Sequence, residues 1–97
     1  MATYVLLATY TEQGLRGIKD TIKRTEAVRE MAKKAGLTMK ESYWTLGQYD
    51  VVAVFEAPDD AAMTAFALAI AKLGNVKTQT LRAFSSKEMA GVLGKIG

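Results

Sequence analysis

Asp50 is the carboxylate of this sequence with the best setting for acid–base chemistry, because it follows a glycine turn and stands among aromatic and β-branched residues. A carboxylate enclosed by apolar walls can act as a base or orient a substrate. An aspartate beside a turn can equally well accept hydrogen bonds from nearby backbone N–H groups. Asp50 is therefore the one candidate catalytic residue, with a purely structural role as the alternative.

Arg82 and Thr80 are candidate ligand-binding residues near the C-terminus, in a segment where alternate residues of a strand would share one side. The planar guanidinium of Arg82 could hold an anionic ligand. It could also form a structural ion pair with Asp50. The two roles are compatible, because a paired arginine keeps free N–H donors.

Lys19 and Arg16 lie on a segment that contains two glycines, Gly14 and Gly17. Such a segment could close over a pocket as a lid and bring Lys19 to a bound molecule. The alternative is that both side chains are ordinary exposed charges of a loop. Lys19 joins the candidate ligand-binding set on the first interpretation.

The aromatic side chains of Tyr43, Trp44 and Tyr49 lie close together in the sequence and could stack on a flat ligand. Core packing or anchoring of an interface is the competing role for such residues. No phosphate-binding loop, dinucleotide fingerprint or pair of catalytic carboxylates accompanies them. The kind of ligand therefore stays open.

The sequence contains no cysteine and no histidine. This excludes disulfides, thiolate catalysis, Ser-His triads, the usual zinc sites and a His-ligated haem. A metal ion would need carboxylate ligands alone. We expect neither a metal nor a cofactor.

The chain has 97 residues, of which 49% are hydrophobic and 24% charged. These values predict a single soluble domain, residues 1–97, with no membrane segment and a cytoplasmic location. A net charge of +3 and a pI near 9.3 favour an anionic partner only weakly. The basic residues are scattered along a helix rather than gathered in a stripe with aromatics, so nucleic acid is not expected.

The stretch from Tyr43 to Phe55 predicts a β-hairpin whose strands are 37–46 and 49–56. Gly47 would stand first in a two-residue turn, where a positive φ costs glycine little. With that turn, Trp44, Leu46, Tyr49, Val51, Ala53 and Phe55 share one side of the hairpin. Tyr43, Thr45, Asp50, Val52 and Val54 share the other.

Apolar spacing and capping residues predict the remaining elements. Residues 11–20 are expected to be mostly irregular because each interior glycine weakens a helix. The other elements are a strand at 3–10, a helix at 22–35 with Thr21 as N-cap, a helix at 61–73, a strand at 76–84, and a short tail helix that begins with a capping box of Ser85 and Glu88.

This order, βαββαβ with a C-terminal helix, predicts a ferredoxin-like α+β fold with a four-stranded antiparallel sheet and both helices on one face. The other face would be bare. Both sides of the hairpin are too apolar to face water, so we expect a second copy of the chain to cover the bare face. A homo-oligomer follows.

The residues Gly47-Gln48-Tyr49-Asp50, together with 43–46, 56–60, 11–14, 73–76 and 80–84, resemble the GYD domain family, named for its Gly, Tyr and Asp. The resemblance implies a dimeric α/β barrel, in which two sheets pack face to face and leave a pocket inside. Cofactor-free oxygenases of the wider barrel group use aromatic residues near their substrates, so the resemblance allows either an enzyme or a binder. Gln48 within the motif, and Thr21-Ile22 where relatives often have Ser-Pro, change no chemical group.

Three functional hypotheses follow from these observations. The first is a homo-oligomer, a dimer or a multiple of dimers, that binds a small anionic or aromatic organic molecule between its sheets. The second is a regulatory or scaffolding module, like trimeric ferredoxin-like signalling proteins, that receives an anionic effector where subunits meet. A pure assembly role for the tail helix is a third.

Overall fold

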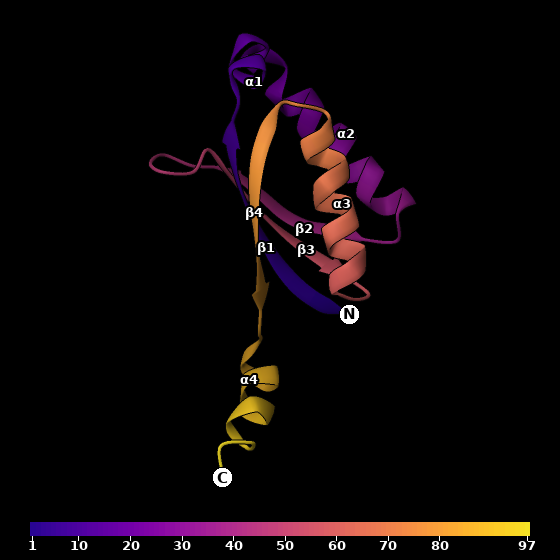
Figure 1. The fold of residues 1–97 in the computed structure, drawn as a ribbon, viewed down its shortest axis with the longest axis vertical. Helices are drawn as coiled ribbons and strands as arrows, with labels where there is room; N and C mark the ends of the chain where they lie inside the picture. The colour runs from indigo at the N-terminus through magenta and orange to yellow at the C-terminus, as the bar shows by residue number, and fades with distance from the viewer.

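The computed structural model describes all residues from 1 to 97. The order of elements is βαββαβ with short additional helices, as the sequence predicts (Figure 1). The strands are β1 (Ala2–Tyr10), β2 (Thr38–Trp44), β3 (Val51–Ala57) and β4 (Val76–Ala83). The helices are α1 (Glu12–Arg16), η1 (Ile18–Asp20), α2 (Thr21–Lys34), α3 (Asp60–Lys72) and α4 (Ser86–Leu93).

The four strands form one antiparallel sheet in the order β2-β3-β1-β4. The long helices α2 and α3 both lie on one side of this sheet (Figure 1). This is the ferredoxin-like α+β arrangement that the sequence predicts. We call the sheet side under α2 and α3 the helix face and the opposite side the open face.

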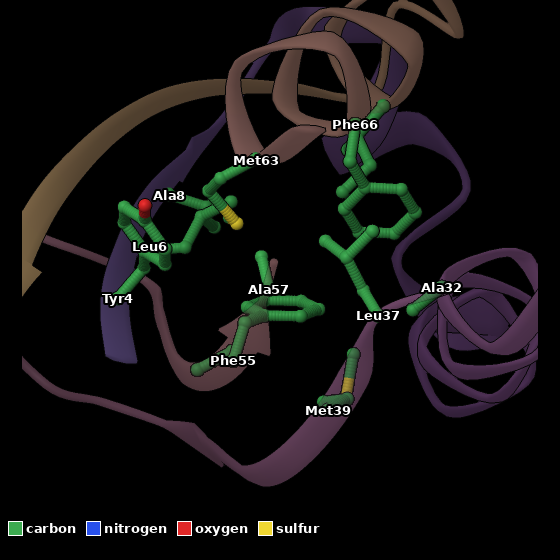
Figure 2. Packing of buried hydrophobic residues seen from close by; sticks show 12 residues of the cluster. Tyr4, Leu6, Ala8, Ala32, Leu37, Met39, Phe55, Ala57, Met63 and Phe66 are labelled. Carbon is green, nitrogen blue, oxygen red and sulfur yellow. The ribbon is translucent and has the colours of Figure 1, made fainter. Parts of the chain in front are cut away.

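The hydrophobic core lies between the helix face and the two long helices (Figure 2). Alternate residues of β1 and β3 point into it because side chains of a strand alternate between the two sides of the sheet. Phe55 of β3 and Phe66 of α3 both belong to this core, and their ring centroids lie 5.4 Å apart at 60°. Truncating either ring to alanine should cost about 3–5 kcal/mol of stability. The core members are Tyr4, Leu6, Ala8, Ala32, Leu37, Met39, Ala53, Phe55, Ala57, Met63, Phe66 and Ile70.

The hairpin has the predicted register, since Trp44 pairs with Val51 and the Thr45 N–H donates to the Asp50 carbonyl over 2.9 Å. Gly47 has the expected positive φ, 120°. The strands are shorter than predicted, because residues 45–50 form a loop rather than a tight two-residue connection. A bulge between Met39 and Glu41 shifts the register in the first half of β2.

The irregular segment predicted at 11–20 is wrong, because it contains α1 and η1. Thr11 caps α1 by accepting a hydrogen bond from the Gly14 N–H over 3.1 Å. Gly14 is required by packing: a Cβ there would lie 2.1 Å from the carbonyl oxygen of Asn75. A contact sixty residues away along the chain thus explains a glycine that local propensity treats as a helix breaker.

Thr21 is not the N-cap of α2, which contradicts the prediction. Asp20 takes that position without a side-chain capping bond. The Thr21 hydroxyl is already engaged by two aromatic residues on the helix face. It shares a hydrogen bond of 2.7 Å with the Tyr10 hydroxyl and accepts the Trp44 indole N–H over 3.1 Å.

The C-terminal arm, residues 84–97, projects away from the rest of the molecule (Figure 1). It accounts for the long axis of the structure, 52 Å against 31 and 18 Å. The predicted capping box of Ser85 and Glu88 is present at the start of α4. The arm carries large apolar side chains that are exposed: Phe84, Met89, Val92, Leu93 and Ile96.

None of the helices combines the length and the apolar composition that a membrane span requires.

Candidate functional site

The open face is apolar at its centre. Val5 and Leu7 of β1 occupy the middle, and they pair with Val54 and Val52 of β3 in one direction. In the other direction Val5 pairs with Leu81 of β4. Leu81 is 43% exposed, and neither long helix reaches this side of the sheet. The apolar surface without helices that the sequence predicts is therefore present.

Polar side chains border this apolar surface at both edges of the sheet. Tyr43 of β2 lies at one edge, 56% exposed, and its hydroxyl donates to Glu41 Oε2 over 2.9 Å. The hydrogen bond to Glu41, followed by the charge of that carboxylate, raises the pKa of the Tyr43 phenol. At the other edge the Tyr49 hydroxyl donates to Gln79 Oε1 over 2.8 Å. Two tyrosines thus flank the apolar centre.

The Asp50 carboxylate is bonded to backbone. Asp50 Oδ2 accepts the Tyr10 N–H over 2.9 Å, and the Asp50 N–H donates to the Ala8 carbonyl over 2.8 Å. Both bonds fasten the hairpin loop to the end of β1. The geometry favours the structural role that the sequence left open for this residue.

The ion pair predicted between Asp50 and Arg82 is wrong. Arg82 pairs with Tyr4 near the start of β1, whereas Asp50 bonds to Ala8 and Tyr10 at the other end of that strand. Arg82 Nη2 instead binds Glu88 Oε2 over 3.1 Å, and the guanidinium lies 4.5 Å from the Phe84 ring centroid. Arg82 thus holds the start of the C-terminal arm.

The predicted ligand-binding residues do not meet in one place. Thr80 and Arg82 lie on the helix face, since they pair with the core residues Leu6 and Tyr4. Trp44 also lies there, as its bond to Thr21 shows. The prediction that Trp44 and Tyr49 share a side is wrong, because the chain leaves the strand ladder after Thr45 and the pleat no longer fixes the direction of Tyr49.

The segment predicted as a lid is tied to the α3–β4 connection. The Thr11 N–H donates to the Asn75 carbonyl over 3.0 Å, and the Thr11 hydroxyl donates to the Gly74 carbonyl over 2.5 Å. Arg16 pairs with Glu12 within α1 over 2.8 Å. Lys19, in η1, is exposed and forms no salt bridge. No group of three or more acidic side chains could hold a metal ion.

A cavity that was not predicted from the sequence lies on the helix face, between α2, α3 and the sheet. Its volume is about 140 Å³. Leu6, Ala53 and Phe55 from the sheet, and Val28 and Ile70 from the helices, belong to its lining. The signal that could have pointed to it is the spacing of Thr21, Arg24, Thr25 and Val28, which places them on one side of α2.

A four-stranded antiparallel sheet with two helices on one face and an apolar second face defines a ferredoxin-like α+β protein. Within that class the chain belongs to the GYD domain family, whose sequence model matches residues 4–93. It is 36% identical over 84 residues to a protein of Thermus thermophilus named "Glutamine synthetase and cystathionine beta-lyase binding protein". That match covers 86% of this chain and 88% of the relative.

Solved structures share the fold. A hypothetical protein from Pyrococcus horikoshii superposes with a TM-score of 0.63 at 22% identity, over 89% of this chain and 93% of that one. The 5-chloro-2-hydroxyhydroquinone dehydrochlorinase of Burkholderia phenoliruptrix, solved with 2,5-dihydroxybenzoquinone, gives a TM-score of 0.63 at 16% identity. Its match covers 88% of this chain and 96% of that one. At these identities the likeness is one of fold alone.

Proposed function

We propose that this protein is a homo-oligomeric binding module, in which the open faces of two copies pack together and hold a small anionic or aromatic organic molecule between them. The observation that carries the proposal is the apolar centre of the open face, formed by Val5, Leu7, Val52, Val54 and Leu81. A soluble protein rarely leaves such a contiguous surface in water. A second copy of the chain presents the same apolar surface, so no other partner protein is needed to cover it.

The free energy available from burying the open face supports the pairing of two copies. Burying one valine or leucine side chain fully contributes about 1.5–3 kcal/mol. Those on the open face are already partly covered by their neighbours, so each contributes less, but two copies supply the set twice. The sum is comparable to the roughly 4–15 kcal/mol that association costs in lost freedom of motion.

The proposed ligand pocket lies at the polar borders of the open face. Tyr43 and Tyr49 are the members of the predicted ligand set that we keep there, with Asp50 fixing the loop that carries Tyr49. Tyrosine suits this position because it offers an aromatic face and a hydroxyl together. Trp44, Thr80 and Arg82 leave the set because they lie on the helix face, and Lys19 because it stands exposed in η1.

Native mass spectrometry of the purified protein tests this function. We expect an even number of subunits and a retained small molecule. Val54→Lys, which places a charge at the centre of the open face, should yield monomers without the molecule. The matched control is Leu68→Lys, because Leu68 lies on α3 and is 65% exposed. This variant should change neither the subunit number nor the retention of the small molecule. A wild-type monomer at high concentration would remove the proposal.

The second candidate is a regulatory or scaffolding module that binds other proteins. It is favoured by one observation, the Thermus thermophilus relative named as a binding protein of two enzymes. On this alternative the open face, or the C-terminal arm, would contact a partner protein, and an anionic effector would bind where subunits meet. The subunit number separates the two candidates, since a trimer is expected here and an even number for face-to-face pairs.

A further inference from the structure

The helix-face cavity is apolar along its depth. It lies between α2 and α3 and over strands β1 and β3, so it is separated from the open face by the sheet itself. Its volume of about 140 Å³ is close to that of engineered apolar cavities that stay dry and accept benzene. The walls include the methionines Met31 and Met39, whose flexible side chains adapt to an occupant.

The lining of this cavity contains one charged residue. Arg24 is the only charged residue of the lining, and no Asp or Glu takes part in it. Thr21, Thr25 and Asn75 are neutral hydrogen-bonding residues of the same lining. Arg24 Nη2 donates to the Gly14 carbonyl over 3.0 Å, and Arg24 forms none of the salt bridges of the molecule. Most of its N–H donors therefore remain free.

A partly buried arginine that forms no salt bridge, in the lining of an apolar cavity, complements a molecule with an anionic head and an apolar body. The flat fork of arginine matches a carboxylate with two parallel hydrogen bonds. A dianionic phosphate would leave charge uncompensated against one arginine. The cavity volume limits the apolar body to about the size of a benzene ring or a branched chain of similar bulk.

We propose that the helix-face cavity is a binding site for a small monocarboxylate, with its apolar body among Leu6, Val28 and Phe55 and its carboxylate on Arg24. The site goes beyond the proposed function, because it needs neither the open face nor a second copy. It adds a small-molecule site on the opposite side of the sheet from the assembly surface.

The test is a titration with benzoate followed by NMR of the methionine methyl groups. Met31 and Met39 line the cavity, whereas Met1 and Met89 stand exposed outside its lining. We expect saturable shifts of Met31 and Met39, and ring-to-methyl cross-relaxation to both, with Met1 and Met89 unaffected. Shifts confined to Met1 and Met89, or no saturable binding, would overturn the proposal.

Variants separate the charge from the cavity. Arg24→Gln should weaken benzoate binding about tenfold or more, because a charge-assisted pair is lost. Lys23→Gln, the adjacent exposed cation of α2, should change the affinity less than twofold. Benzyl alcohol, a neutral ligand of similar shape, should respond to neither variant. Equal losses from Arg24→Gln and Lys23→Gln would instead indicate unspecific attraction and contradict the site.

A cavity-filling variant completes the experiment. Val28→Phe should abolish benzoate binding while the circular dichroism spectrum stays that of the wild type. Should this variant not fold, the cross-relaxation measured on the wild type decides the question alone. The subunit number should be the same for the wild type and Arg24→Gln, so failure of this site and failure of the open-face pairing are read from different measurements.

Discussion

At the scale of single residues, Gly14 shows most clearly how tertiary contacts decide local structure. It stands inside α1, where the backbone comes so close to the Asn75 carbonyl that no side chain fits. The N–H of Thr11 bonds to the same carbonyl oxygen. The connection between α3 and β4 and the segment after β1 are thus held in contact by backbone groups of both.

Gly14→Ala should therefore destabilise the protein by about 1–3 kcal/mol, because the new methyl group must displace backbone rather than a flexible side chain. Gly17→Ala is the matched control. A Cβ at Gly17 meets nothing nearer than Arg24 Nη1 at 3.5 Å, and its φ of −100° suits alanine, so stability should stay the same or rise slightly. Urea denaturation measures both. Equal effects would show that helix propensity, and not the Asn75 contact, governs this position.

At the scale of elements, α4 depends on a small group of charges at its first turn. Glu88 Oε1 accepts the Ser85 N–H over 3.1 Å, and Glu88 Oε2 binds Arg82. The backbone bond from Ser85, and then the hydrogen bond from Arg82, hold the pKa of Glu88 below its ordinary value of 4.5. The carboxylate form is thus the one that the folded helix prefers.

The sign of the pH effect follows from that shift. Because the pKa of Glu88 is lower in the folded arm than in the unfolded one, its contribution to α4 is complete above about pH 4.5 and is lost as the pH falls through the folded value. Carbon chemical shifts of residues 86–93 should therefore lose helical character on acidification. In Glu88→Gln they should be less helical at neutral pH and nearly independent of pH. An unchanged acid profile in this variant would show that another group controls α4.

At the scale of the whole molecule, the C-terminal arm stands apart from a body that is complete without it. Every core residue lies between Tyr4 and Ile70, whereas the apolar residues of the arm remain exposed, Ile96 at 76%. The arm leaves through β4, whose Leu81 belongs to the apolar centre of the open face. On the proposed pairing of open faces, the arm would lie against the second copy.

Removal of residues 85–97 should leave the body folded and lower the strength of self-association. We expect the thermal unfolding transition of the isolated body to persist, and light scattering after size-exclusion chromatography to show dissociation at higher protein concentration than for the full chain. An unchanged assembly size at all concentrations would count against a role of the arm in assembly.

Much of this architecture could be predicted from the sequence. The alternation of apolar and polar residues, the capping residues and the glycine at position 47 are local signals. They predicted the element order, the hairpin register and the α4 capping box, and the structure confirms all three. Features set by distant contacts were missed. Gly14 depends on Asn75, the partner of Arg82 depends on the register between β1 and β4, and the cavity depends on how two helices rest on the sheet.

The bulge in β2 has a further consequence for how the sheet can grow. β2 is an edge strand, and an edge with regular free N–H and C=O groups invites another strand to add to it. Here the register breaks between Met39 and Glu41, and the residue in the gap is the charged Lys40. An added strand would not find a continuous row of free backbone N–H and C=O groups, and it would meet the charge of Lys40. The β2 edge of the sheet therefore resists fibril-like extension.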